Sequence, residues 1–594
     1  MADTLKGLKR THFCGDLRAA DCGKSVTLYG WAAKQRDLGS LVFIDLRDRT
    51  GITQLAFDET TAKEVFEKAQ SVRSEFVLTA TGTVRERSNK NKEIPTGDIE
   101  IDVTDLRILS KSETPPFVID DNCNTGETQR LAYRYLDLRR PVLQKNILMR
   151  HKIAQITRDY FYANDFIEIE TPMMIKSTPE GARDYVVPSR IHDGKFYALP
   201  QSPQIYKQLC MIAGFDRYIQ LARCFRDEDL RADRQPEFTQ VDLEMSFVEL
   251  DDIMGMAEGY VARLMKETLG VEVSLPLPRM TFEEAMNRYG SDKPDTRFEM
   301  LIEDIGDWAE KTDFVVFKNA LAEGGAVKAI VAKNAAATYT RKKIDKLTEH
   351  AKGIGAKGLA YIRWAEEEPA CSFKKFLKEG ELEALLAALQ VEQGDCVFIV
   401  SDKTRKALTI MGALRLLIAK ELSLIPEGKW NYLWITEMPF FELDEDSGEW
   451  VAAHHPFTMP MEESVPYLES DKAKVKAQAF DLVLNGTELS SGSMRITDCE
   501  LQRKMFELLG MSDEEINAKF GFLVDAYHYA APPHGGMGIG LDRIAMLICG
   551  AESLRDVVAF PKIQNASEPM SGAPSFVDDA QLEELHIALT SKED

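Results

Sequence analysis

Short segments in which apolar and polar residues alternate predict that residues 1–112 form a small β-barrel. Alternation places successive side chains on opposite faces of a strand, so that one face packs inward. Five such segments are separated by turns that contain glycine: residues 25–31, 41–46, 52–57, 76–84 and 99–103. Five strands in about 100 residues are typical of a closed barrel of the OB type.

Basic side chains are interleaved with an aromatic residue in this predicted barrel. The cations are Lys34, Arg36, Arg47 and Arg49, and Phe43 lies between them in the sequence. In OB-folds, a ring on a basic barrel face stacks on unpaired nucleic-acid bases. The same pattern arises when the ring belongs to the core and the charges are solvated, and the pattern alone does not separate these two interpretations.

Beyond the barrel, the pattern changes three times. Pro115-Pro116 and the polar run 120–127 predict a linker. Helical periodicity follows at about 130–138 and at 141–162, and the next apolar segment, 166–170, predicts a strand stopped by Pro172. From about residue 286 to 425 the chain becomes rich in Ala, Lys and Glu, which predicts an inserted domain.

Composition narrows the class of protein only modestly. The 594 residues are 44% hydrophobic and 28% charged, as in ordinary globular proteins. Because no apolar run approaches the roughly 18 residues that span a bilayer and no signal peptide is evident, we expect a cytoplasmic protein without a membrane partner. The net charge of −23 argues against nucleic acid unless local basic patches contact it. The nine cysteines form no CxxC pair, so neither a zinc site nor a disulfide scaffold is expected.

A strand, a charged loop and a second strand over residues 217–245 predict the floor of a site. One face of the second strand combines Phe238, Gln240, Asp242 and Glu244. One face of the first combines Gln220, Cys224, Arg226 and Glu228. Such a dense mixture of charged and amide side chains above an apolar underside is typical of a binding site, the alternative being a solvated sheet face.

A predicted hairpin brings two carboxylates together. Asn485-Gly486 between apolar strands is a strong signal for a two-residue turn. Pairing about this turn sets Val483 opposite Glu488 and Asp481 opposite Ser490, so that Asp481 and Glu488 lie diagonally on one face, within reach of a shared divalent cation. Arg495 joins that face only if the strand bulges, which we expect at residues 491–493.

Three further patterns are weaker. The glycines from Gly535 to Gly540 lead into an apolar helix with Arg543 in its first turn, which suits an anionic ligand or merely close packing under a helix. If the chain is helical from Pro203, Gln204 and Lys207 share one helix face. His454-His455 has no metal-ligand spacing, so hydrogen bonding is the expected role.

Taken together and in this order, these segments resemble class II aminoacyl-tRNA synthetases of the aspartyl type, in their bacterial form. Residues 166–172 resemble the first motif of the class, 225–228 with the following loop and strand the second, and 538–543 the third. Segments 178–185, 201–204 and 454–458 resemble aspartyl-specific ones. The resemblance covers essentially the whole chain.

The resemblance implies an α+β multidomain fold, in which an N-terminal OB-fold barrel precedes a catalytic domain built on an antiparallel sheet and carrying an inserted α/β domain. The implied division is an anticodon-binding barrel over 1–112, a hinge over 113–144, a catalytic domain in two parts over 145–285 and 426–560, the inserted domain over 286–425 and a C-terminal extension over 561–594.

The resemblance also implies a role for each candidate residue. The residues implied in catalysis are Arg226, Glu228 and Arg543. Those implied in binding L-aspartate are Glu180, Gln204, Lys207, Arg226, Asp242, His454 and Arg495. Those implied in binding ATP are Arg226, Asp227, Glu228, Gln235, Phe238, Glu488, Gly540, Leu541, Asp542 and Arg543. Magnesium is implied at Asp481 and Glu488, and anticodon contacts at Arg36, Phe43, Gln54 and Glu100.

The implied reaction is the activation of L-aspartate by ATP, with Mg2+, followed by transfer to the 3′-terminal adenosine of tRNA-Asp in a homodimer formed through the first motif. We expect selection against asparagine because an amide would leave Lys207 and Arg495 buried without a counter-charge, at about 3–5 kcal/mol. Leu38 resembles members that charge tRNA-Asp alone. Ser490 and Ser491 replace glycines usual in relatives, and Ala56 replaces an aromatic residue of the barrel.

Three other functions are alternatives to the one that the resemblance implies. Lysyl or asparaginyl specificity is disfavoured, since a lysine pocket needs acidic residues where Lys207 and Arg495 stand. A non-catalytic RNA-binding paralogue is expected to lose Arg226, Arg543 or the carboxylate pair, and all are present. An ATP-dependent ligase without an RNA partner would not need residues 1–112.

Overall fold

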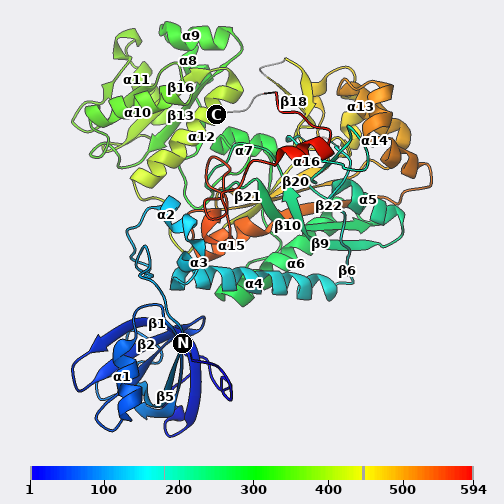
Figure 1. The fold of residues 1–594 in the computed structure, drawn as a ribbon. Coiled ribbons are helices and arrows are strands. Elements are labelled where there is room, and N and C mark those ends of the chain that lie inside the picture. Colours follow the sequence, from blue (N-terminus) through cyan, green and yellow to red (C-terminus); the bar gives the residue numbers. More distant parts are fainter. Residues whose placement is uncertain (1–2, 179–180, 445–447, 591–594) are drawn as a thin grey trace. The chain divides into compact units, whose positions relative to one another are not determined.

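The computed structural model describes residues 3–178, 181–444 and 448–590 (Figure 1), so the candidate residue Glu180 lies outside the described part. The chain separates into two compact units. The first comprises Met1–Lys152, Asp229–Pro236 and Ala545–Glu583, and the second comprises Ile153–Glu228, Glu237–Ile544 and Glu584–Asp594.

The first unit contains the predicted barrel. Its strands are β1 (Ser25–Asp37), β2 (Val42–Asp48), β3 (Gly51–Phe57), β4 (Val77–Glu86) and β5 (Ile99–Ser110), which close in the order β1-β2-β3-β5-β4. Helix α1 (Lys63–Ser71) connects β3 to β4. Leu28, Ile44 and Leu55 are fully buried inside the barrel, as their alternation with polar neighbours predicts. The predicted OB-type barrel is therefore confirmed.

Helices follow the barrel along the chain. The single helix predicted over 130–138 is instead two, α2 (Glu127–Ala132) and α3 (Arg134–Asp137), because Tyr133 between them leaves the helical region with φ −115° and ψ 43°. Helix α4 (Pro141–Tyr162) has the predicted bounds and begins at a proline, which is favourable at the first helical position. The fully buried Asp137 accepts hydrogen bonds from Arg134 at 2.8 Å and Arg140 at 3.1 Å.

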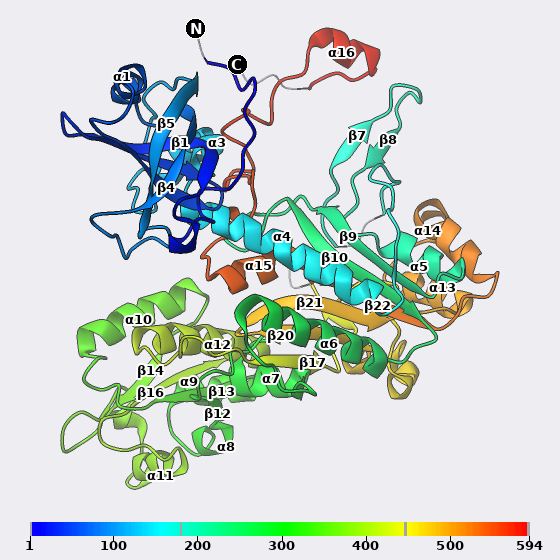
Figure 2. The ribbon, with the colours of Figure 1, turned by 90° about the horizontal axis from the view of Figure 1, so that it is seen from below.

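The second unit is built on an eight-stranded sheet in the order β11-β17-β20-β21-β22-β10-β9-β6 (Figure 2). The strands are β6 (Ile167–Glu168), β9 (Arg217–Phe225), β10 (Glu237–Ser246), β11 (Arg279–Thr281), β17 (Tyr432–Thr436), β20 (Ala479–Leu484), β21 (Thr487–Met494) and β22 (His534–Gly540). The central pairs are antiparallel and the two edge pairs, β6–β9 and β11–β17, are parallel. Helices α5 (Gln204–Ile212) and α6 (Leu250–Leu269) pack against the strands β10 and β22, respectively.

A separate five-stranded sheet forms within the predicted insertion. Its order is β12 (Ile302–Asp304), β13 (Ala326–Ala332), β16 (Cys396–Asp402), β14 (Ala360–Arg363) and β15 (Ala370–Cys371). The accompanying helices are α8 (Gly306–Ala309), α9 (Val315–Ala322), α10 (Arg341–Gly353), α11 (Glu381–Ala388) and α12 (Thr404–Glu421). Alternate residues of β16 enter two different apolar cores, Phe398 with α10 and α12, and Ile399 with α9 and α11. The segment thus combines a sheet with helices in two apolar cores, which is an α/β arrangement.

The remaining elements lie outside these sheets. The helices are α7 (Phe282–Tyr289), α13 (Cys499–Leu508), α14 (Asp513–Tyr527), α15 (Leu541–Cys549) and α16 (Asp579–Glu584), and the hairpins are β7 (Val186–Pro188) with β8 (Phe196–Ala198) and β18 (Phe441–Leu443) with β19 (Trp450–Ala452). Short 3-10 helices occur at Ala19–Asp21, Lys374–Phe376, Glu462–Tyr467, Lys472–Lys474 and Leu554–Asp556. Among the described residues, no helix is long and apolar enough to cross a bilayer.

Candidate active site

The strands β9, β10 and β22 form the floor of the candidate site. Asp242 of β10 is paired with Gln220 of β9 on one side and with Gly538 of β22 on the other. The glycines of β22 make room for the carboxylates of β10, because a Cβ atom at Gly536 would overlap the Glu244 carboxylate. The glycine-rich pattern therefore serves the close approach of charged side chains within the sheet, which neither sequence interpretation anticipated.

Lys207 and Arg495 meet over this floor, around one carboxylate. Lys207 Nζ donates to Asp242 Oδ1 at 2.5 Å and lies 3.3 Å from Glu244 Oε2. Arg495 binds the same Glu244 through Nε at 2.8 Å and Nη2 at 3.0 Å. All four side chains are at least 95% buried. Burial would raise the pKa of Glu244, but Arg495 and Lys207 offset that effect and lower it, whereas burial dominates at Asp242 and raises its pKa.

This pairing corrects the expectation that an amide ligand would leave both cations without a counter-charge. Lys207 and Arg495 already have Asp242 and Glu244 as partners. Of the five N–H donors of Arg495, the described contacts use four, because Nη1 also donates to His455 Nε2 at 2.8 Å and to Ser493 Oγ. Selection between a carboxylate and an amide ligand must therefore depend on the hydrogen-bond donors that the protein leaves unused. It cannot depend on cations without a counter-charge, because both cations have one.

Four candidate residues bury a polar atom that has no hydrogen-bond partner in the described part of the chain. These atoms are Gln204 Nε2, Arg226 Nε, His454 Nε2 and Asp481 Oδ1. They come from helix α5, the end of β9, the segment after β19 and strand β20. Buried polar groups in folded proteins are nearly always satisfied, so exceptions at a predicted site indicate groups that a ligand completes.

The two adjacent histidines have different surroundings. His455 accepts from Arg495, and burial together with that guanidinium lowers the pKa of His455 well below its usual value, so the ring is neutral. His454 Nδ1 lies 3.5 Å from Ser491 Oγ, and burial lowers the pKa of His454 too. Sequence reasoning singled out His454 and missed His455 as the partner of Arg495.

The predicted second-motif residues lie at the end of β9 and the start of β10. The Arg226 guanidinium stacks over the Phe238 ring, with its carbon 5.2 Å from the ring centre. Strand β9 ends at Phe225, so Arg226 and Glu228 follow the strand instead of continuing its face as predicted. Asp227 pairs with Arg183 at 3.4 Å. In the first unit, the Gln235 side-chain amide both donates to and accepts from the backbone of Lys562.

The hairpin of β20 and β21 has the predicted turn but a different register. Asn485 and Gly486 have φ values of 53° and 83°, as a two-residue turn between twisted strands requires. Val483 is opposite Glu488 as predicted, whereas Asp481 is opposite Ser491 and not Ser490. The bulge therefore falls at Leu489, earlier than the expected position at 491–493. The extra residue reverses the face on which each later side chain of the strand lies, so that Arg495 shares the face of Glu488.

Among the described residues, the Asp481 and Glu488 carboxylates of this hairpin form no close ion pair. Asp481 is buried, and burial together with the Glu488 charge raises the pKa of Asp481 well above its usual value. Glu488 Oε1 lies 3.8 Å from Arg543 Nη1, which donates to the Glu488 carbonyl at 2.9 Å. A buried carboxylate oxygen without a partner beside a second carboxylate is a donor set that fits a hard divalent cation.

The predicted third motif joins β22 to α15. Gly540 ends the strand, and Leu541, Asp542 and Arg543 form the first turn of the helix. Asp542 Oδ2 accepts from the Thr239 backbone N–H at 3.0 Å, which ties the start of α15 to β10. In the same helical turn, Arg543 contacts Glu488.

The anticodon candidates meet on the barrel of the first unit. Arg36 donates to Gln54 Oε1 at 2.8 Å and lies over Phe43, 5.6 Å from the ring centre. Gln54 Nε2 donates to Glu100 Oε2 at 2.7 Å. Two further cations that the sequence analysis missed complete the cluster, since Arg87 donates to Gln54 and Arg85 to Glu100. Arg36 Nε and Arg87 Nε are buried without a partner in the described residues.

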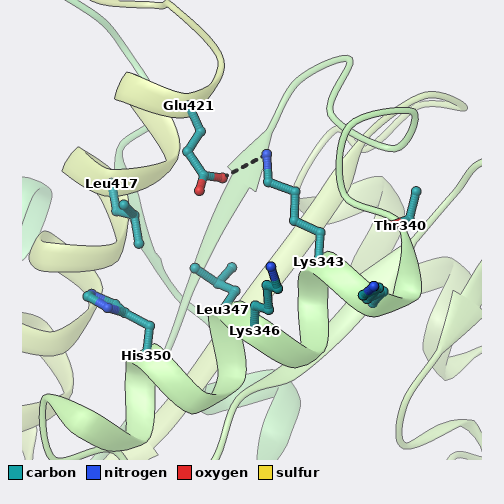
Figure 3. Close-up of a pocket in the computed structure, with 8 residues that line it drawn as sticks. Thr340, Lys343, Lys346, Leu347, His350, Leu417 and Glu421 are labelled. Atoms are coloured by element: carbon teal, nitrogen blue, oxygen red, sulfur yellow. Dashed lines mark ion pairs between the residues drawn. The ribbon is translucent and has the colours of Figure 1, made fainter.

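Another cavity lies in the inserted segment. It has a volume of about 460 Å3 and is lined by residues of α10 and α12 and the residue before α10 (Figure 3): Thr340, Lys342, Lys343, Lys346, Leu347, His350, Leu417 and Glu421. Lys343 Nζ is paired with Glu421 Oε2 at 3.1 Å, as the dashed line in Figure 3 marks. Its lining residues are all distinct from the candidate residues of the eight-stranded sheet.

Comparison with known families agrees with this geometry. The family model described as tRNA synthetases class II (D, K and N) matches residues 126–564, and the model described as OB-fold nucleic acid binding domain matches residues 26–109. The chain therefore belongs to the class II tRNA synthetase family of the D, K and N type, and the predicted fold class is confirmed.

Individual relatives identify the aspartyl branch of this family. The aspartate–tRNA(Asp/Asn) ligase of Caldanaerobacter subterraneus subsp. tengcongensis is 55% identical over 99% of this chain and 100% of its own. The aspartate–tRNA ligase of Ruminiclostridium cellulolyticum is 53% identical over 100% of both chains. The asparaginyl-tRNA synthetase of Pyrococcus horikoshii, solved with asparaginyl-adenylate, has a TM-score of 0.58 at 18% identity over 93% of this chain and 98% of its own, which shows a shared fold. The predicted resemblance is confirmed.

Proposed function

We propose that this chain is an aspartate–tRNA ligase, which converts L-aspartate and ATP to aspartyl-adenylate and pyrophosphate and then transfers aspartate to the 3′-terminal adenosine of tRNA-Asp. The observation that carries the proposal is the set of four buried polar atoms, on Gln204, Arg226, His454 and Asp481, that have no partner among the described residues, together with the buried Lys207–Arg495 pair. Full-length relatives with this activity in their names support it.

Adenylate formation is a displacement at the α-phosphorus of ATP, and it needs positioning and charge neutralisation more than a protein nucleophile. Arg226 binds the α-phosphate and the aspartate α-carboxylate through the Nε that has no partner among the described residues, while Phe238 stacks on adenine beside it. Arg543 binds the terminal phosphates. The residues of the second unit that position the nucleotide around them are Asp227, Glu228, Gly540, Leu541 and Asp542.

Lys207 and Arg495 bind the side-chain carboxylate of aspartate. Asp242 and Glu244 hold both cations in place, and His454 and Gln204 complete the pocket. The side-chain oxygen of Gln204 and the carboxylate of Glu180 accept hydrogen bonds from the substrate ammonium. An amide in place of the carboxylate would turn its own N–H groups towards these charged donors. We expect that mismatch to weaken the binding of asparagine relative to aspartate by about 2–3 kcal/mol, or roughly 10²-fold.

Asp481 and Glu488 fit a magnesium ion. Asp481 contributes a buried oxygen without a partner, and Glu488 lies on the same face of the hairpin. The ion neutralises phosphate charge when bound. The protein contributes the rigid hairpin turn that fixes the two carboxylates relative to Arg543.

The barrel reads the anticodon through Arg36, Phe43, Gln54 and Glu100. We expect Phe43→Ala to raise KM for tRNA-Asp roughly 10-fold, because stacking of a base on an aromatic side chain contributes about 1–3 kcal/mol. Aminoacylation kinetics at varied tRNA measure this effect, and aspartate-dependent pyrophosphate exchange, which needs no tRNA, serves as the internal control. Equal losses in both assays would contradict the anticodon role.

Two further proposals concern the partner subunit and the choice of transfer RNA. Strand β6 is an edge of the eight-stranded sheet and carries the half-exposed Ile167, which suits a homodimer formed through this strand. Leu38 directly follows β1 and is 66% exposed, and its resemblance to members that charge tRNA-Asp alone favours that specificity. Charging of tRNA-Asp and tRNA-Asn transcripts side by side tests the second point.

Pyrophosphate exchange with ATP tests the function directly, with aspartate, asparagine and lysine supplied separately. We expect exchange with aspartate and about 10²-fold less, or none, with asparagine. Exchange with another amino acid would overturn the roles of Lys207 and Arg495. No exchange with any of them, in folded protein, would favour an RNA-binding paralogue.

A further inference from the structure

Lys293 lies against Glu488, although no sequence pattern assigned it a role. Its Nζ is 3.9 Å from Glu488 Oε2, while Arg543 Nη1 is 3.8 Å from Glu488 Oε1. Glu488 is therefore placed between two cations, one next to each of its oxygens. The Lys293 side chain is 47% exposed, so its ammonium group can leave the carboxylate for a ligand without first breaking a buried contact.

The backbone around Lys293 is firmly held. Asp295 is buried and accepts from the backbone N–H and the side chain of Arg297. The fully buried Arg415 donates from Nη1 to the Asp295 carbonyl at 3.1 Å. These contacts fix the backbone of the segment that follows Lys293.

The same segment is fastened to the turn of the carboxylate hairpin. Asn431 Nδ2 donates to the Thr296 carbonyl at 3.0 Å, and the Asn431 backbone N–H donates to Asn485 Oδ1 at 2.9 Å. A Cβ atom at Gly486 would come within 3.1 Å of the Asp295 Cβ, so the turn packs directly on this segment. Lys293 and Glu488 therefore belong to one packed body.

We propose that Lys293 binds the β- and γ-phosphates of ATP on the side of Glu488 opposite Arg543. This inference rests on the proposed function and adds a residue to its ATP site. A triphosphate entering between Arg543 and Lys293 meets a cation on each side, and the pyrophosphate that leaves carries the negative charge these cations stabilise. Without ATP, the Lys293 ammonium lies between two carboxylates, 3.7 Å from Asp292 Oδ1 and 3.9 Å from Glu488 Oε2.

Equilibrium binding of ATP and AMP separates this role from a structural one, because AMP lacks the phosphates concerned. Titration calorimetry in magnesium buffer, without aspartate, compares the wild type with Lys293→Met, Lys293→Arg and the control Lys429→Met, an exposed lysine near the same hairpin turn. We expect Lys293→Met to weaken ATP binding roughly 10- to 100-fold and AMP binding less than about 2-fold. Lys293→Arg should retain most of the affinity for ATP, and Lys429→Met all of it.

Pyrophosphate exchange on the same proteins should show a raised KM for ATP in Lys293→Met and an unchanged KM for aspartate. Equal weakening of ATP and AMP, or unchanged ATP binding, in protein whose thermal unfolding matches the wild type would overturn the proposal. Failure of the wild type to exchange with aspartate would instead contradict the proposed function, and the ATP-to-AMP comparison would still decide the role of Lys293.

Discussion

Replacing Lys207 with methionine is expected to lower kcat/KM for aspartate in pyrophosphate exchange roughly 10²–10³-fold and the free energy of unfolding by about 3–5 kcal/mol. Lys207 is 2% exposed and contacts both Asp242 and Glu244. Methionine has a similar volume but no charge, so Arg495 alone would face two buried carboxylates. Both the loss of a carboxylate-binding donor and the uncompensated charge follow from the same substitution.

The two effects are measured separately. Exchange rates at saturating ATP and varied aspartate give the kinetic loss, and urea unfolding gives the change in stability. Lys311→Met, at an exposed lysine of the inserted segment, provides a matched control that should leave both unchanged. A Lys207→Met protein that retained wild-type kcat/KM for aspartate would show that the carboxylate is bound elsewhere.

Side-chain parity explains why the floor of the site could be predicted from the sequence. A strand fixes which residues share a face, so Asp242 and Glu244 were placed together before their surroundings were known. Parity does not predict which helices and distant strands pack against that face. Glu244 is the carboxylate shared by Lys207 and Arg495, residues 37 and 251 positions away in the chain, and its role depends on how a helix and a distant strand pack against β10.

The hairpin shows the same limit on a smaller scale. The Asn485-Gly486 turn follows from local conformational preference, because both residues adopt positive φ readily. The bulge at Leu489 depends instead on the pairing of β21 with β22, whose glycines accept the strand closely. A bulge was required to bring Arg495 to the site, but its position could not be read from residues 487–494 alone.

Net charge was the least informative property of the sequence. At −23 it argued against nucleic acid, yet the barrel gathers Arg36, Arg85 and Arg87 around Gln54 and Glu100. Arg85 lies in β4 and Arg87 directly follows it, so the two cations are two positions apart in the sequence. Their meeting with Gln54 depends on the order of the strands in the barrel, because β5 lies between β3 and β4.

Asp481→Asn is expected to raise the free energy of unfolding and to lower the exchange activity. The Asp481 carboxylate is buried with one oxygen unpartnered and with Glu488 nearby, so an amide of the same shape removes an unfavourable buried charge. Without divalent cations, we expect the free energy of unfolding to rise by about 1 kcal/mol. Exchange activity should fall roughly 10²-fold, because a ligand of the cation that neutralises phosphate charge is lost.

Opposite signs for the two effects distinguish a ligand-binding carboxylate from a structural one. Urea unfolding in chelator and exchange rates over a magnesium titration supply both measurements, and Asp345→Asn, at an exposed position of α10, is the matched control. A structural Asp481 would lose stability and activity together when changed to asparagine. An Asp481 without a part in the reaction would gain stability and keep its rate, so the combination of a more stable and slower protein is specific to the proposed role.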